Sequence, residues 1–285
     1  MQGQKHIHVK NIDTSSPEVS VVIPAYNAGQ FLSETIFSIL AQEGVDFEVL
    51  IVDDCSTDQT AEIIKSVASD DRRVKYLCMP SNSGGPAGPR NMGVNAARGK
   101  WVAFCDADDI WHPRKLRLQI DFAQRDNSDL VCSAIVDFID GTKPILPEEI
   151  RDDTLFVHSL PYWQMLLKDR IATSSVLCGR DALIESGGFN TARDLVAVED
   201  YDLWLRLMES PSFKVLRIAT PLVAYRRLPK SLSANKLRHI RKVMRVARLA
   251  ATRGGWGWAF PLFLPVIFAG YSSLSLYWRV LRNRL

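Results

Sequence analysis

The first half of the chain alternates short apolar runs with amphipathic segments, and this alternation restricts the fold to a narrow class. Apolar residues recur at helical spacing between the runs, as at Ile36, Ile39 and Leu40. Uniformly apolar strands separated by amphipathic helices are typical of a parallel sheet covered on both faces. The sequence therefore predicts an α/β fold with a mainly parallel, Rossmann-like sheet, whose first five strands are expected at 19–23, 47–52, 74–78, 101–105 and 130–136.

Polar and aromatic residues gather where the predicted strands end. Tyr26 and Asn27 follow the first strand, and Asp53-Asp54 ends the second. Ligands of such sheets bind at the carboxyl ends of the strands, so these residues are expected to share one site. There Tyr26 could stack on a nucleobase and Asn27 could cap the next helix.

Two acidic motifs are candidates for chemistry. The apolar run 101–105 ends in Asp106, Asp108 and Asp109, and hard divalent cations prefer such oxygen ligands. Asp-x-Asp triplets are often merely solvated, but the position at a strand end favours a metal site here. Farther along, Glu199-Asp200 opens a predicted helix, where a carboxylate could act as general base. The simpler alternative is stabilisation of the helix start, worth about 0.3–1 kcal/mol.

Charge is distributed unevenly along the chain. Residues 210–285 contain 15 Lys and Arg and no Asp or Glu, whereas residues 1–209 carry all 32 acidic residues against 20 basic ones. This asymmetry suggests an acidic catalytic body followed by a tail that faces an anionic surface. The five cysteines show neither zinc-site nor disulfide spacing. The N-terminus has no apolar signal sequence, and residues 1–17 are expected to form a loose lead-in.

The tail contains two distinct segments. Residues 235–253 form a basic amphipathic pattern that suits either an anionic membrane surface or packing on the body of the protein. Residues 256–278 carry no charge and are long enough to span a bilayer, although Pro261, Pro265 and Gly270 interrupt them. A span, a segment lying on the membrane and a segment packed on protein all remain open. Of these, we expect residues 231–285 to form a membrane-associated appendage.

Taken in order, six segments resemble the inverting glycosyltransferases of family 2. They are spread across residues 18–227, at distances that fit the family, which makes the resemblance specific. Cys55 departs from the pattern, because the family usually has Gly or Asn there. The matching segments are Val-Val-Ile-Pro-Ala-Tyr-Asn at 21–27, Val-Asp-Asp-Cys-Ser-Thr-Asp at 52–58, Ala-Gly-Pro-Arg-Asn-Met-Gly at 87–93, Phe-Cys-Asp-Ala-Asp-Asp at 104–109, Gly-Gly-Phe at 187–189 and Glu-Asp-Tyr-Asp-Leu at 199–203.

The resemblance implies a GT-A fold over residues 18–230 and a role for each matched residue. Tyr26 and Asp54 would bind the nucleobase, and Arg90 would lie near the sugar diphosphate. Asp106 and Asp108 would hold Mg²⁺ or Mn²⁺, with Asp108 the better direct ligand. Asp200 would be the general base, and Glu199 would help orient acceptor or donor.

The implied activity is transfer of a single sugar, with inversion, from a UDP- or dTDP-type nucleotide sugar. The Gln-x-x-Arg-Trp motif of processive members is absent from the sequence. Together with the basic tail, the resemblance predicts a lipid-linked saccharide acceptor at the cytoplasmic side of the plasma membrane, as in surface polysaccharide assembly, and no nucleic acid partner. The alternatives are a nucleotidyltransferase and a non-catalytic sugar-nucleotide-binding scaffold.

Overall fold

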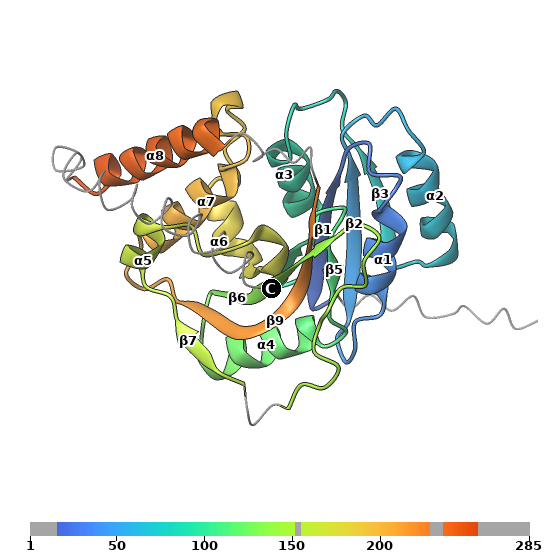
Figure 1. The fold of residues 1–285 in the computed structure, drawn as a ribbon, viewed down its shortest axis with the longest axis horizontal. Helices are drawn as coiled ribbons and strands as arrows, with labels where there is room; N and C mark the ends of the chain where they lie inside the picture. Colours follow the sequence, from blue (N-terminus) through green and yellow to red (C-terminus); the bar gives the residue numbers. More distant parts are fainter. Residues whose placement is uncertain (1–15, 152–154, 229–235, 256–285) are drawn as a thin grey trace, which may run out of the picture.

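A nine-stranded sheet forms the centre of the molecule (Figure 1). The computed structural model describes residues 16–151, 155–228 and 236–255. Across the sheet the order is β3 (Val74–Cys78), β2 (Phe47–Asp53), β1 (Val19–Ala25), β4 (Trp101–Phe104), β8 (Leu177–Gly179), β6 (Leu130–Ile139), β9 (Val215–Arg227) and β5 (Ile110–Trp111), with β7 (Val157–Ser159) paired to β9.

The strand directions agree with the expected mainly parallel sheet. Strands β3, β2, β1 and β4 pair in parallel, and β6 and β9, which are parallel to each other, run in the same direction. Only β8, β5 and β7 run against this direction among the strands of the described residues. The antiparallel β8 separates the parallel first half from the β6–β9 half.

Helices cover both faces of the sheet. They are α1 (Leu32–Leu40), α2 (Thr60–Asp70), α3 (Ala87–Ala96), α4 (Lys115–Arg125), α5 (Tyr162–Leu167), α6 (Arg180–Glu185), α7 (Glu199–Met208) and α8 (Lys236–Arg253), with 3-10 turns η2 (Thr173–Ser175) and η3 (Arg193–Leu195). Figure 1 shows α7 and α8 on the side of the molecule away from α1 and α2.

Alternation along each strand divides the core in two. Val21 and Ile23 of β1 belong to the cluster under α1, α2 and α4, whereas Val22 belongs to the cluster under α3, α7 and α8. Because successive strand side chains point to opposite faces, a strand that is apolar at every position must be buried on both sides. This is why the continuous apolar runs predicted the architecture.

The structure also corrects several details. The fifth strand, expected at 130–136, extends to Ile139, and it pairs with the 13-residue β9. Asn27 does not cap α1, which begins at Leu32 without a side-chain cap. Instead its Oδ1 accepts a hydrogen bond from the Thr57 N–H (2.8 Å), and its own N–H donates to Ser56 Oγ (2.9 Å), so that it ties two strand-end loops together.

The basic amphipathic helix of the tail is present as α8, and its apolar side packs on the body. Val243, Val246 and Ala250 are buried in the same cluster as Trp204 of α7. These side chains are therefore not exposed to a membrane surface. None of the helices in the described residues is long and apolar enough to cross a bilayer. The apolar run 256–278 lies outside the described residues.

Candidate active site

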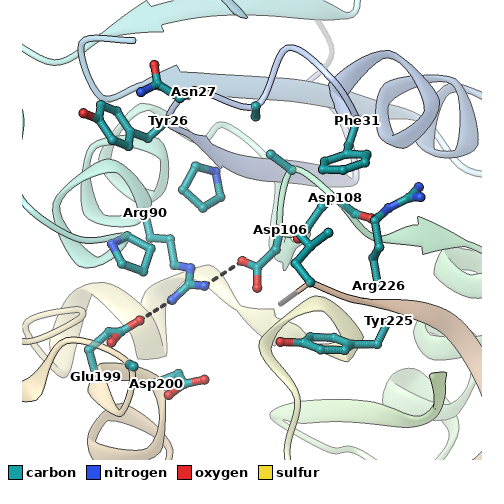
Figure 2. A pocket seen from close by; sticks show the side chains of 16 residues that line it. Tyr26, Asn27, Phe31, Arg90, Asp106, Asp108, Glu199, Asp200, Tyr225 and Arg226 are labelled. Carbon is teal, nitrogen blue, oxygen red and sulfur yellow. Dashed lines mark hydrogen bonds and ion pairs between the residues drawn. The ribbon is translucent and has the colours of Figure 1, made fainter. Parts of the chain in front are cut away.

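A cavity of about 400 Å³ opens at the carboxyl ends of β1 and β4. It is bounded by the loop after β1, the turn after β4, helix α3, the start of α7 and the end of β9 (Figure 2). All of the residues assigned to the site from sequence except Asp54 line it: Tyr26, Arg90, Asp106, Asp108, Glu199 and Asp200. Carboxylates from positions 108 and 200 thus reach one cavity, although Asp108 follows a strand and Asp200 lies at the start of a helix.

Arg90 joins the two acidic motifs. Its guanidinium is 3% exposed and donates to Glu199 Oε1 at 2.8 Å and to Asp106 Oδ1 at 2.7 Å (Figure 2). Burial alone would lower the pKa of Arg90, but the negative charges of Asp106 and Glu199 raise it above its usual value. A permanent positive charge is therefore held between the two halves of the cavity.

Asp106 and Asp108 fit a divalent cation. Burial, followed by the nearby charge of Asp106, raises the pKa of Asp108 to about 6. A cation between or beside two neighbouring carboxylates offsets the electrostatic repulsion between them. Among the described residues, no cluster of three or more His, Cys, Asp or Glu could enclose a metal. Mg²⁺ is commonly bound by one or two carboxylates together with substrate phosphates, and that pattern matches the pair present here.

Arg226 of β9 is hydrogen-bonded to the acidic turn that follows β4. Its N–H donates to Asp109 Oδ1 (3.0 Å) and its Nε to the Asp108 carbonyl (2.9 Å). The same guanidinium is buried and forms ion pairs with Glu34 and Asp140. Asp109 is fully buried, and burial raises its pKa well above the usual range. Asp109 therefore acts as an anchor for β9 rather than as a group facing the cavity.

Glu199 and Asp200 begin α7, where the helix dipole favours negative charge. Asp200 Oδ2 accepts a hydrogen bond from Thr173 Oγ1 at 2.6 Å, which orients the carboxylate. Glu199 is 3% exposed, and its Oε2 has no hydrogen-bond partner among the described residues. Burial and the charge of Asp200 raise the pKa of Glu199, while Arg90 opposes the rise. Glu199 is thus fixed to Arg90, and Asp200 is the carboxylate with access to the cavity.

The Gly-Gly-Phe segment supports Arg90 through Asn91. The Asn91 side chain donates to the Phe189 carbonyl and accepts from the Phe189 N–H, both at 2.8 Å. Phe189 in turn lies beneath the Arg90 guanidinium, 5.3 Å from ring centroid to carbon. Gly188 has a φ of +71°, and a Cβ added there would lie 2.5 Å from Asn91 Oδ1. Glycine is therefore required by both backbone conformation and space.

Asp54 does not line the cavity. It is buried, and both of its oxygens accept hydrogen bonds from Ser83, one from the backbone N–H and one from the hydroxyl, each at 2.8 Å. A nucleobase would compete with Ser83 for these atoms. The role of Asp54 in base binding stays a prediction.

Helix α8 fastens the loop that precedes α7. Lys242 Nζ donates to the Val196 carbonyl at 2.6 Å, and Arg245 forms an ion pair with Asp194 at 2.5 Å. Ala197, which lines the cavity, has a φ of +74°. Alanine in this region costs about 1–2 kcal/mol, so the loop keeps a strained backbone next to the acidic pair. Such strain is common at functional sites.

Several residues of the site were not predicted from sequence. Thr173 gave no signal, because its role depends on the meeting of η2 with α7. Tyr225 and Arg226 line the cavity at the end of β9. The pair follows an apolar run, which is the same strand-end signal that identified Tyr26, and it could have been recognised in that way.

Comparison with known proteins agrees with this geometry. The family model described as Glycosyl transferase family 2 matches residues 20–184. TuaG of Bacillus subtilis, whose name refers to teichuronic acid biosynthesis, is 30% identical over 237 residues, covering 81% of this chain and 88% of that protein. WfaP of Escherichia coli, named as a UDP-Glc:alpha-D-GlcNAc-diphosphoundecaprenol beta-1,3-glucosyltransferase, is 31% identical over 226 residues, covering 78% and 82%.

Similarity to a solved structure provides evidence about the fold only. The mannosyltransferase PcManGT from Pyrobaculum calidifontis, in complex with GDP-Man and Mn²⁺, superposes with a TM-score of 0.62 at 18% identity. The match covers 92% of this chain and 76% of that one. The GT-A architecture expected from the sequence is thereby confirmed for the described body of the protein.

Proposed function

The chain belongs to glycosyltransferase family 2, and from that premise we propose that it transfers one sugar from a UDP- or dTDP-sugar to a hydroxyl group of a lipid-linked saccharide, with inversion at the anomeric carbon. The observation that carries the proposal is the single cavity lined by Asp106, Asp108, Arg90 and Asp200. It combines a phosphate-binding half with a base-bearing half.

The proposed mechanism uses these two halves in turn. Arg90, held by Glu199 and Asp106, offers a fixed positive charge to the diphosphate that leaves. Asp200, oriented by Thr173, accepts the proton of the acceptor hydroxyl as that oxygen attacks the anomeric carbon. Glu199 is ion-paired with Arg90 at 2.8 Å, so it is not free to act as a nucleophile that would form a covalent sugar intermediate. A single displacement of this kind inverts configuration.

Metal dependence is part of the proposal. Asp108, with Asp106 beside it, would hold Mg²⁺ or Mn²⁺. When bound, the cation neutralises charge on the leaving diphosphate as a Lewis acid. The proposal is supported by the raised pKa of Asp108, which reports a carboxylate placed where negative charge is disfavoured. The Mn²⁺ in the complex of PcManGT is consistent with it.

Membrane association at the cytoplasmic side of the plasma membrane is also proposed. The apolar side of α8 packs on α7, so the exposed arginines of this helix, such as Arg241 and Arg248, are the groups available to anionic lipids. The acceptor of WfaP is an undecaprenol diphosphate saccharide, and an acceptor of that kind would be presented at this surface. Flotation with anionic and neutral vesicles tests this step. The Arg241→Glu/Arg248→Glu protein should lose binding to anionic vesicles, whereas Arg72→Glu should not.

Nucleotide release from a panel of nucleotide sugars tests the activity. The wild type should release UDP or dTDP from one donor in the presence of Mn²⁺, and Asp200→Asn should reduce transfer by about 10²–10⁴-fold, the usual contribution of a general base. Asp181→Asn on α6, outside the cavity, is the matched control. NMR of the product's anomeric proton distinguishes inversion from retention.

The same assay decides against the alternatives. A scaffold would bind the nucleotide sugar without turning it over, with or without Asp200. A nucleotidyltransferase would release no nucleoside diphosphate from a nucleotide sugar; with added diphosphate it would instead form a nucleoside triphosphate and a sugar 1-phosphate. Full transfer activity in Asp200→Asn would refute the assignment of the base.

A further inference from the structure

A second cavity, of about 660 Å³, lies next to the general base and shares no lining residue with the first. Its walls come from β6, β7, β9, α8 and the loop between α5 and η2. They carry a concentration of basic side chains that the proposed mechanism does not use: His158, Lys168, Arg170, Arg217, Arg227 and His239.

Most of these basic side chains form no ion pair with a described residue. Arg227 forms an ion pair with Asp137 at 2.9 Å. By contrast, Lys168, Arg170 and Arg217 form no ion pair with a carboxylate among the described residues, and Arg217 donates to the backbone carbonyl of Arg170. Burial, and then the like charge of Arg170, lowers the pKa of Lys168, while the negative charge of Asp169 opposes the shift. Cations brought together in this way favour an anion between them.

Two buried histidine nitrogens also indicate that the cavity binds a polar ligand. The Nδ1 atoms of His158 and His239 are buried without a hydrogen-bond partner among the described residues. Asp169 is the only acidic residue that lines the cavity in the described part of the chain. Its Oδ1 accepts a hydrogen bond from the Ile171 N–H at 3.1 Å, and burial raises its pKa well above the usual range. The lining therefore offers donors and positive charge well in excess of negative charge.

The cavity lies close to Asp200. Ile171 and Ala172 line it, and the next residue, Thr173, donates to Asp200 Oδ2 at 2.6 Å. The charge of Asp200 also perturbs Asp169 and His239. At the end of β9, Tyr225 and Arg226 line the first cavity, called here the donor cavity because it is proposed to bind the nucleotide sugar. Arg227 lines the second cavity. A molecule bound in this second cavity can therefore place a hydroxyl group near Asp200 without occupying the first cavity.

We propose that this cavity, called here the basic pocket (Lys168, Arg170, Arg217, His158 and His239), binds the phosphate or diphosphate of the acceptor. The proposal rests on the function proposed above and specifies its acceptor as a phosphoryl-linked saccharide. The phosphoryl group can belong to a lipid diphosphate or to a lipid-free sugar phosphate. The volume suits a diphosphate with its first sugar, since small-ligand pockets typically measure about 300–1,000 Å³.

Binding of one sugar-free and one lipid-free phosphoryl probe to the full-length protein tests the pocket without knowledge of the natural acceptor. UDP and Mn²⁺ are first titrated by calorimetry to fill the donor cavity. Farnesyl diphosphate, farnesol and N-acetylglucosamine 1-phosphate are then titrated separately. Farnesyl diphosphate should bind and farnesol should not. The affinity of the sugar phosphate relative to farnesyl diphosphate shows whether the lipid diphosphate or the phosphate alone is recognised.

The variants are the double substitution Arg170→Gln/Arg217→Gln and the single substitution Lys168→Gln, whose side chain donates no hydrogen bond to a described residue. Arg72→Gln is the matched surface control. Each lost charge-assisted contact should weaken phosphoryl binding about tenfold, while UDP affinity stays within about twofold of the wild type. Equal affinity for farnesyl diphosphate in all four proteins, or no binding of either phosphoryl probe, would overturn the assignment. If the wild type bound neither UDP nor dTDP, the proposed function would be refuted instead, and the pocket result would remain interpretable.

Discussion

The support of Arg90 by Gly188 and Asn91 can be tested by a pair of adjacent glycine substitutions. Gly187 and Gly188 both follow α6 with left-handed backbones, φ +79° and +71°. A Cβ at Gly187 would meet nothing within 4 Å, whereas one at Gly188 would lie 2.5 Å from Asn91 Oδ1. Gly187→Ala therefore measures the backbone cost alone, and Gly188→Ala measures the same cost plus displacement of Asn91.

The expected magnitudes follow from these contacts. An alanine in the left-handed region costs about 1–2 kcal/mol, partly offset by about 0.4–1 kcal/mol from the reduced entropy of the unfolded chain. Gly187→Ala should thus destabilise by about 1 kcal/mol. In Gly188→Ala the two Asn91–Phe189 hydrogen bonds are also lost, at about 1 kcal/mol each, which brings the total to about 3 kcal/mol.

Urea unfolding of both variants, together with Asn91→Ala and Gly188→Ala/Asn91→Ala, provides the measurement. The double variant should lose less than the sum of its parts, because the clash requires Asn91. Since Phe189 lies beneath Arg90, Gly188→Ala should also raise the donor KM, while Gly187→Ala should not. Equal free energies of unfolding for the two glycine variants, or strict additivity in the double variant, would show that the Asn91 contact does not determine the cost.

Three further changes address separate features. Asp108→Asn should lower kcat/KM by about 10²–10³-fold and raise the Mn²⁺ concentration needed for half-maximal activity; an unchanged metal titration would exclude Asp108 as a ligand. Cys55 has a φ of +62°, so Cys55→Gly should stabilise the protein by about 0.5–1 kcal/mol in urea unfolding. Burial lowers the pKa of Lys115 to about 7, from the usual lysine value of 10.5. The unfolded chain then binds more protons between these values, and stability should rise as pH increases from about 7 towards 10.5. In Lys115→Met that rise should be absent when unfolding is compared at pH 7 and 9.

The parts of the fold that the sequence predicts are those with a repeated local signal. Strands β1, β2 and β3 were located to within two residues because each is apolar at nearly every position. Strands β5 and β8 have two and three residues, too short for any periodicity. The extent of β9 was missed because Pro221 and Thr220 interrupt its apolar pattern, where β6 and β9 pair with register shifts.

The site divides in the same way. Residues directly after a strand, such as Asp106 and Asp108, are placed by topology and could be assigned before the structure was known. The bond from Thr173 to Asp200, and the meeting of Arg90 with Glu199, join segments that are 27 and 109 residues apart. No local pattern encodes such contacts. The basic pocket could not be predicted for the same reason, since its members come from β7, β9, α8 and the loop between α5 and η2.

The packing of α8 on α7 has a practical consequence for anyone who shortens this protein. A chain cut where β9 ends, at Arg227, would lose Val243, Val246 and Ala250 from the core that contains Trp204. It would also lose the hydrogen bond from Lys242 to the strained loop that precedes α7. Such a fragment would be expected to aggregate or to lose activity for reasons unrelated to lipids. Expression boundaries are better chosen beyond Gly255, where the described helix has ended.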